Sequence, residues 1–267
     1  MTWSTVRHTI GQRTRGLRTL ARRATDRRPE TINTGPAQGL RLPRRLASAH
    51  YAESPNELPV QEAVAQALRP GDVFFDVGAN VGLFSLIASR IVGPTGTVIA
   101  FEPIPEIARQ LEANASINSL RNIRVLQIAV ADRDGEMLLQ TTAHPGGATL
   151  EGFGVPYDRT GTISVQTRTV DSLIAEGAIP PPNVVKIDVE GAEAAVLRGM
   201  PNVLASGRPT FVFELDAADD EELRSKRLEV ESIFASAGFE SSELPLSYGG
   251  NHLVRHFVAR PVVGLQE

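Results

Sequence analysis

The sequence contains no cysteine, which excludes disulfide bonds, thiolate catalysis and zinc–cysteine sites. Aromatic residues make up only 5% of the chain, too few for the stacking platforms that bind single-stranded nucleic acid. No apolar run is long enough to span a membrane, and no compact apolar segment typical of a signal peptide follows the first methionine. We therefore expect a soluble, cytoplasmic protein that does not bind nucleic acid.

Lysine is also scarce, because arginine supplies all but two of the 27 basic residues. One of the two lysines, Lys186, lies in an apolar stretch typical of a β-strand, and Asp188 and Glu190 follow it at alternate positions. Alternate residues of a strand project from the same face, so these three side chains are expected to point the same way. Buried charges are costly unless they are paired. The pattern therefore favours a functional site over an ion pair that merely ends the strand.

Positive charge is concentrated near the start of the chain. Residues 1–45 contain eleven arginines and two acidic residues, so they carry +9 and the remainder carries −13 of the overall −4. Apolar residues recur at three- and four-residue steps between Trp3 and Ala24, which predicts an amphipathic helix with an arginine-rich face. Residues 31–38 are typical of a polar linker. We expect residues 1–45 to form a basic N-terminal helical extension that is solvated or docked. The alternatives are peripheral contact with a membrane surface and a transit peptide.

Helical and strand patterns alternate from residue 58 onward. The predicted strands are residues 72–77, 97–101, 123–130, 184–189, 210–215, 241–246 and 253–259. Strands that alternate with helices predict an α/β protein with a doubly wound, mostly parallel sheet. The alternation pauses before the fourth strand, where residues 136–141 and 162–169 predict a β-hairpin insert. In a doubly wound sheet this insert would lie on the ligand side, so it is a candidate lid.

A glycine loop between the first strand and its helix is the main candidate for cofactor binding. It reads Asp76-Val-Gly-Ala-Asn-Val-Gly82, which is neither the dinucleotide fingerprint nor a Walker loop. Its glycines allow a sharp turn close to a ligand, and the helix start directs amides towards it. Glu102, at the end of the second strand, can accept hydrogen bonds from both hydroxyls of a ribose, or it can cap the next helix. Together these residues suggest an adenosyl ligand without phosphates, S-adenosylmethionine.

Several motifs, in order and spacing, resemble the FkbM family of S-adenosylmethionine-dependent methyltransferases. They are residues 74–84 around the glycine loop, Phe101-Glu-Pro, Lys186-Ile-Asp-Val-Glu-Gly-Ala-Glu, Leu197-Arg-Gly and Phe213-Glu-Leu. The resemblance runs from about Tyr51 to Ala259 and leaves the N-terminal arm outside. It implies a class I (Rossmann-like) methyltransferase domain over residues 46–267, with a seven-stranded sheet. It also implies O-methylation of a hydroxyl on a small-molecule natural product, a sugar or another glycan, or a glycolipid. The cofactor-binding residues that it implies are Asp76, Gly78, Asn80, Gly82, Glu102, Ala129 and Val130.

Methyl transfer to a hydroxyl group requires alignment of the nucleophile and removal of its proton. Asp188, at the carboxyl end of the fourth strand, is the candidate base or substrate-orienting carboxylate, and Lys186 is expected to hold it in place. Glu190 can bind substrate hydroxyls or favour the start of the next helix, which is the more ordinary interpretation for Glu193.

Carboxylates at the ends of the fourth and fifth strands also allow a metal site. Asp188, Glu214 and Asp216 could bind Mg²⁺, which would lower the pKa of the substrate hydroxyl. We rank this metal-assisted reaction below metal-free catalysis, because such carboxylates often belong to structural ion pairs. A non-catalytic cofactor-binding module is a further alternative. An NAD-dependent oxidoreductase is disfavoured by the missing fingerprint.

Other side chains are weaker candidates. His144 and His252 are loop histidines that could titrate near neutrality and act as bases. His256 is expected to pack within a strand or face solvent. Glu53 and Glu57 could close over the cofactor, and Asp132 is expected to belong to a turn rather than to an adenine site.

Overall fold

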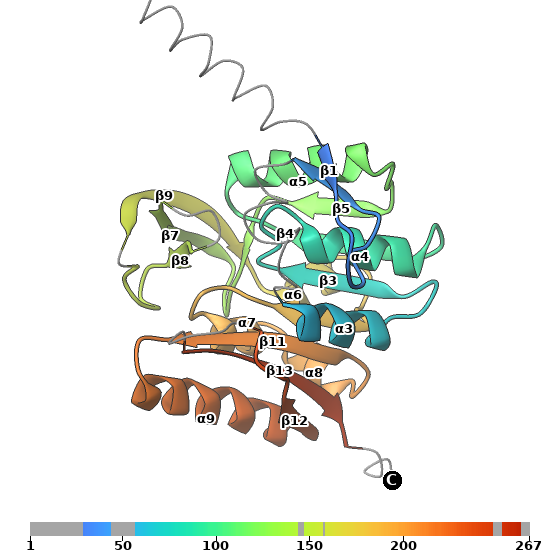
Figure 1. The fold of residues 1–267 in the computed structure, drawn as a ribbon. Helices are drawn as coiled ribbons and strands as arrows, with labels where there is room; N and C mark the ends of the chain where they lie inside the picture. Colours follow the sequence, from blue (N-terminus) through green and yellow to red (C-terminus); the bar gives the residue numbers. More distant parts are fainter. Residues whose placement is uncertain (1–28, 44–56, 144–146, 157, 248–252, 263–267) are drawn as a thin grey trace, which may run out of the picture.

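The computed structural model describes residues 29–43, 57–143, 147–156, 158–247 and 253–262. A seven-stranded sheet forms its centre, in the order β12-β13-β11-β10-β3-β4-β5 (Figure 1). The strands are β3 (Val73–Val77), β4 (Thr97–Phe101), β5 (Ile123–Leu126), β10 (Val184–Ile187), β11 (Thr210–Ala217), β12 (Phe239–Glu243) and β13 (Leu253–Pro261). Strands β11 to β5 run parallel, whereas β13 is antiparallel to both of its neighbours. The predicted α/β class with a seven-stranded, mostly parallel sheet is confirmed.

Helices cover both faces of this sheet. Their bounds are α3 (Leu58–Ala67), α4 (Leu83–Val92), α5 (Pro105–Ile117), α6 (Val170–Ala175), α7 (Glu193–Arg198), α8 (Pro201–Ala205) and α9 (Asp220–Ser236). On one face, Val64 of α3 and Ala88 of α4 pack in one cluster with Phe74 of β3. On the opposite face, Phe234 of α9 packs against Phe211 and Phe213, with ring centroids 5.1 and 5.2 Å apart. Apolar strand residues are therefore buried on both sides, as a parallel sheet requires.

Polar side chains interrupt one of these faces near the carboxyl ends of the central parallel strands. Asp76 and Lys186 are register partners in β3 and β10, and Glu214 and His256 are register partners in β11 and β13. Side chains alternate along a strand, and these four residues lie on the same face as the apolar Phe74 cluster. The face covered by α3 and α4 thus changes from apolar to charged along its length.

The chain between β5 and α6 forms a second, four-stranded sheet. Its strands are β6 (Ala129–Val130), β7 (Gly135–Thr142), β8 (Thr149–Leu150) and β9 (Arg159–Arg168), in the order β6-β9-β7-β8. Strands β7 and β9, over the region predicted as a hairpin, pair antiparallel. The prediction of one continuous strand over residues 123–130 is wrong. After Leu126 the chain turns, with the Ile128 amide bonded to the Leu126 carbonyl, and Ala129 and Val130 join β9 instead.

The described part of the N-terminal region is a hairpin of β1 (Pro29–Thr31) and β2 (Arg41–Pro43). Ile32 and Leu42, which it contributes, are buried in one cluster with Leu83, Leu86 and Ile87 of α4. The prediction of a polar linker over residues 31–38 is therefore wrong, because the apolar residues of this segment cover an apolar surface of α4. The basic helix predicted between Trp3 and Ala24 lies outside the described residues. Within the described part of the chain, no helix combines the length and apolarity needed to cross a bilayer.

Candidate active site

A cavity of about 390 Å³ lies at the carboxyl ends of β3, β4, β10 and β11. Its lining includes Gly78 and Asn80 of the glycine loop, Glu102, and Ala129 and Val130 of β6. The second sheet closes another side through residues such as Leu139 and Leu150. In an open α/β sheet, ligands bind outside the carboxyl ends of the strands, so this cavity is at the expected place.

The glycine loop is held by the end of β4. The amides of Gly78 and Ala79 both donate to the Phe101 carbonyl, at 3.1 and 3.0 Å. Gly78 has a φ of 80°, and a Cβ added there would lie 1.8 Å from the carbonyl oxygen of Asp188. Only glycine can therefore occupy this position without displacing Asp188. Asn80 also has a positive φ, 49°, and its buried Oδ1 has no hydrogen-bond partner among the described residues.

Glu102 connects the glycine loop to helix α5. Its Oε2 accepts from the Asn80 amide at 3.0 Å, and its Oε1 accepts from the Ile104 amide, at the start of α5, at 2.8 Å. The predicted capping of α5 is therefore present, while the side chain also lines the cavity. Burial raises the pKa of Glu102 to about 7 despite these two hydrogen bonds. Each carboxylate oxygen keeps a further lone pair, so two ligand hydroxyls can still donate to it.

Two of the predicted cofactor residues lie behind the loop and not on the cavity wall. Asp76 is buried, and its Oδ2 accepts from the Ser85 hydroxyl at 2.6 Å. Burial raises the pKa of Asp76, although Lys186 opposes the shift. Gly82 precedes α4, where an added Cβ would lie 2.6 Å from Cγ of Leu111. Asp76 and Gly82 therefore support the loop from behind, Asp76 through its hydrogen bond with Ser85 and Gly82 through close packing.

Lys186 is a buried cation shared by the strand-end carboxylates. Its Nζ donates to Oδ2 of Asp188 at 2.7 Å and lies 4.4 Å from the ring centroid of Phe84. Burial alone would lower the pKa of Lys186, but Asp188, Asp76 and Glu57 together hold that pKa above its ordinary value. Lys186 therefore stays charged at neutral pH and cannot act as a base. It fixes one oxygen of Asp188, which lines the cavity.

Glu190 lies beside Asp188 on the cavity wall, where it does not begin a helix as one interpretation of the sequence expected. Helix α7 begins at Glu193, and Glu190 has the left-handed φ of 54°. Burial and the nearby Asp188 raise the pKa of Glu190 to about 9, so its carboxyl group carries a proton at neutral pH. Glu193 is buried in the first turn of α7 and accepts from the Gly191 amide at 2.9 Å, which fits the structural role expected for it.

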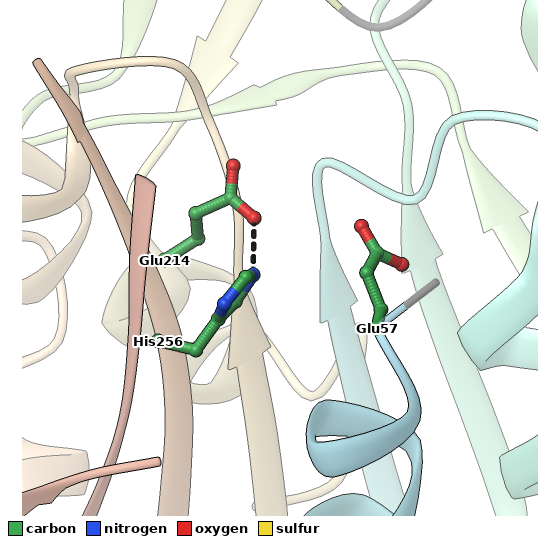
Figure 2. A group of neighbouring side chains, drawn as sticks. All are labelled: Glu57, Glu214 and His256. Atoms are coloured by element: carbon green, nitrogen blue, oxygen red, sulfur yellow. Dashed lines mark hydrogen bonds and ion pairs between the residues drawn. The ribbon is translucent and has the colours of Figure 1, made fainter. Parts of the chain in front are cut away.

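Glu214 and His256 form a partly buried pair that the sequence did not predict (Figure 2). Nε2 of His256 lies 2.6 Å from Oε2 of Glu214, and Glu57 approaches the pair from the start of α3. Burial lowers the pKa of His256, so the neutral ring can donate to the carboxylate. Burial and the charge of Asp188 raise the pKa of Glu214 well above its ordinary value. Glu57 and Glu214 line the cavity, whereas Glu53, His144 and His252 lie outside the described residues.

The carboxylates also form two groups whose oxygen or nitrogen atoms lie within 4.8 Å of one another. One is Glu57, Glu214 and His256, and the other is Asp188, Glu190 and Glu214. Asp216, which we predicted as a metal ligand, belongs to neither group, and its Oδ1 lies 3.8 Å from Nζ of Lys226. Lys186 already supplies one positive charge next to Asp188. Asp132 pairs with Arg133 at 3.6 Å and does not line the cavity, as a turn residue should.

The fold, the glycine loop and Glu102 define an S-adenosylmethionine-dependent class I methyltransferase. A solved structure described as a putative rRNA-methylase from Clostridium thermocellum has the same fold, with a TM-score of 0.50 and 10% identity. The match covers 74% of this chain and 91% of that one. The chain belongs to the FkbM methyltransferase family, because the family model for the methyltransferase FkbM domain matches residues 76–241.

Two curated relatives have named substrates. The chain is 33% identical over 196 residues to the 31-O-demethyl-FK506 methyltransferase FkbM of Streptomyces tacrolimicus. This match covers 60% of this chain and 75% of that protein. It is 32% identical over 135 residues to the hexuronic acid methyltransferase AglP of Haloferax volcanii. That match covers 51% of this chain and spans about half, 52%, of the relative.

Proposed function

We propose that this methyltransferase acts on a hydroxyl group of a sugar, a glycolipid or another natural product. The observation that carries the proposal is the Lys186–Asp188 pair, which holds a carboxylate on the cavity wall next to the glycine loop. A carboxylate fixed in this way can accept a hydrogen bond from a substrate hydroxyl and orient its oxygen. The name of the Streptomyces relative, which specifies an O-methylation, supports a hydroxyl acceptor.

The cavity suits S-adenosylmethionine, which supplies an electrophilic methyl group on a positively charged sulfur. Glu102 can accept the ribose hydroxyls, and the unpartnered Oδ1 of Asn80 can accept a further donor. The carboxylates of Glu57 and Asp188 add negative potential to the wall, which favours a cationic ligand. Ala129 and Val130 offer an apolar surface at the β6 end, where an adenine ring can pack.

In the proposed reaction, Asp188 orients the acceptor hydroxyl and takes its proton. When bound, S-adenosylmethionine would supply its methyl group to the acceptor oxygen, and the electron pair of the broken carbon–sulfur bond would stay on sulfur. The thioether S-adenosylhomocysteine and the methyl ether are the products. Lys186 keeps Asp188 in position throughout, and Glu214, held by His256, carries a second carboxyl group at the same wall.

A metal-assisted version of the same reaction is the second candidate. It is favoured by the two groups of potential ligands that share Glu214. In this version a divalent cation would lower the pKa of the acceptor hydroxyl, and Asp188 would bind the cation. We rank it lower because the ammonium group of Lys186 already lies 2.7 Å from the Asp188 carboxylate.

Two measurements test the proposal. Calorimetry with the full-length protein should detect S-adenosylmethionine binding and no NAD binding. Cofactor labelled on its methyl group should then transfer the label to hydroxyl compounds in a panel of glycosides, glycolipids and macrolides. Cofactor binding without any transfer would favour the non-catalytic module. Transfer to amines or carboxylates, but not to hydroxyl groups, would contradict the proposed acceptor class.

A further inference from the structure

A second cavity, of about 640 Å³, begins where the cofactor cavity ends. The two cavities share the lining residues Gly147, Asp158, Glu190 and Glu214. From this shared wall, the second cavity extends along the end of β11, the first turns of α9, the start of β13 and residues 153–156, which connect β8 to β9. A group at the shared wall can therefore reach both the cofactor side and this second space.

The ionisable side chains on the wall of the second cavity are mostly acidic. Its acidic lining residues are Asp158, Glu190, Glu214, Asp216 and Glu222. Among the described lining residues Lys226 is the only basic one, and its ammonium group already contacts Glu222 and Asp216. Its Nζ lies 3.0 Å from Oε1 of Glu222 and donates to the Asp216 carbonyl at 2.7 Å.

Two arginines on neighbouring elements contact carboxylates that do not line this cavity. Arg227 of α9 pairs with Glu231 and Glu243, and its guanidinium lies 5.0 Å from the ring centroid of Phe257. Arg255 of β13 lies 3.4 Å from Glu243. Neither arginine lines the cavity, so a bound anion would meet carboxyl groups there without a free basic partner among the described residues.

We infer that the second cavity is the acceptor site and that it selects neutral hydroxyl compounds over counterparts carrying a carboxylate, phosphate or sulfate. This inference rests on the proposed function. A neutral polyol suits such a wall because carboxyl groups accept from its hydroxyls when ionised and can also donate to them when protonated. An anion would be repelled by the groups that stay ionised.

Apolar groups on the same wall add a second feature of the acceptor. Phe153 and Val155 come from the connection between β8 and β9, and Leu253 and Val254 come from β13. Val155 is 76% exposed, so it offers a free apolar contact at this wall. A wall that combines carboxyl groups with apolar side chains matches a sugar ring, which carries hydroxyls at its edge and C–H groups on its faces.

A preference for neutral acceptors would distinguish this chain from its Haloferax relative, whose name specifies a hexuronic acid. The test uses the full-length protein loaded with S-adenosylhomocysteine and matched pairs of methyl glycosides. Each pair consists of a hexoside and its hexuronide, in the gluco, galacto and manno series. Saturation-transfer NMR then measures binding of each compound, and the measurement is repeated at high salt.

We expect at least one hexoside to bind about ten-fold more tightly than its hexuronide, with a smaller difference at high salt. Asp216→Asn, which removes one charge from the cavity wall, should narrow the difference. Glu229→Gln, on the part of α9 that pairs with Arg198, is the matched control and should leave it unchanged. Equal or tighter binding of every hexuronide, or binding of no hexoside, would overturn the inference. Failure of the unsubstituted protein to bind S-adenosylmethionine would instead refute the proposed function. A failure of the acceptor inference can therefore be distinguished from a failure of the proposed function.

Discussion

Removal of the Glu102 carboxylate is the sharpest test of the cofactor site. In the proposed complex this side chain accepts two ribose hydroxyls in addition to the amides of Asn80 and Ile104. Hydrogen bonds to a charged group are worth about 1.5–3 kcal/mol each, so losing both costs about 3–6 kcal/mol. We expect Glu102→Ala to raise the Kd for S-adenosylmethionine by about 10²- to 10⁴-fold. Glu102→Gln keeps one acceptor oxygen and should lose roughly half of that free energy.

The raised pKa of Glu102 gives the same experiment a second, independent readout. Hydroxyl donors favour the ionised carboxylate, so cofactor binding should lower the pKa of Glu102 from about 7 and release a proton. Calorimetry at pH 6.5 in two buffers of different ionisation enthalpy measures this release. It should disappear in Glu102→Gln and persist in Glu193→Gln. The latter is a suitable control because burial also raises the pKa of Glu193 to about 7, while its side chain does not line the cavity.

The structural role of Glu102 has to be separated from its role in binding. Both variants weaken the connection between the glycine loop and α5. The melting temperature of the unliganded protein should therefore be lower in each variant. A lower melting temperature with unchanged cofactor affinity and unchanged proton release would refute the reasoning. Glu102 would then be a structural link alone.

Three further predictions concern chemistry, stability and pH. Asp188→Asn should retain S-adenosylmethionine binding and lower the rate of methyl transfer by about 10²- to 10⁴-fold in a labelled-methyl assay. A near-normal rate in this variant would assign proton removal to Glu214. If the unsubstituted enzyme instead loses activity in EDTA and regains it with Mg²⁺, the metal-assisted reaction is favoured. Leu42→Ala should lower the free energy of unfolding by about 2–3 kcal/mol in urea titrations, because Leu42 is fully buried against α4. A change below about 0.5 kcal/mol would mean that the β1–β2 hairpin is detached from α4 in solution. The pKa values of Glu190 and Glu193 are raised by folding to about 9 and about 7, so the folded state binds more protons than the unfolded state. The unfolding free energy of the unliganded protein should therefore fall between pH 6 and pH 9, and a rise would contradict these shifts.

The sequence predicted the features that depend on local patterns. The alternation of strands and helices, the glycine loop and the acid after β4 are all encoded within short segments, and the described cavity lies where they meet. Residues 123–130 were misassigned because the apolar pattern continues through Ala129 and Val130. A local pattern does not specify which of two sheets a strand will join, and here Ala129 and Val130 pair with β9.

Features that depend on distant contacts were not predictable in the same way. The Glu214–His256 pair joins residues 42 positions apart and requires the last strand to lie antiparallel beside β11. Similarly, the burial of Ile32 and Leu42 depends on an apolar surface of α4 that only the folded domain presents. Strand alternation could have placed Asp76 on the Lys186 side of the sheet, whereas the motif alone suggested direct contact with the cofactor.

The close approach of Gly78 to Asp188 limits how this enzyme can be altered. With a Cβ at position 78 only 1.8 Å from the Asp188 carbonyl, the loop that faces the cofactor and the segment that carries the chemistry share one backbone contact. The main effect of a substitution at Gly78 would therefore be to displace the Asp188 carboxylate. Weaker cofactor binding would be a secondary effect. In a chimaera with another methyltransferase, the loop and the end of β10 should be exchanged together. Exchange of either one alone would join two surfaces that did not evolve to fit.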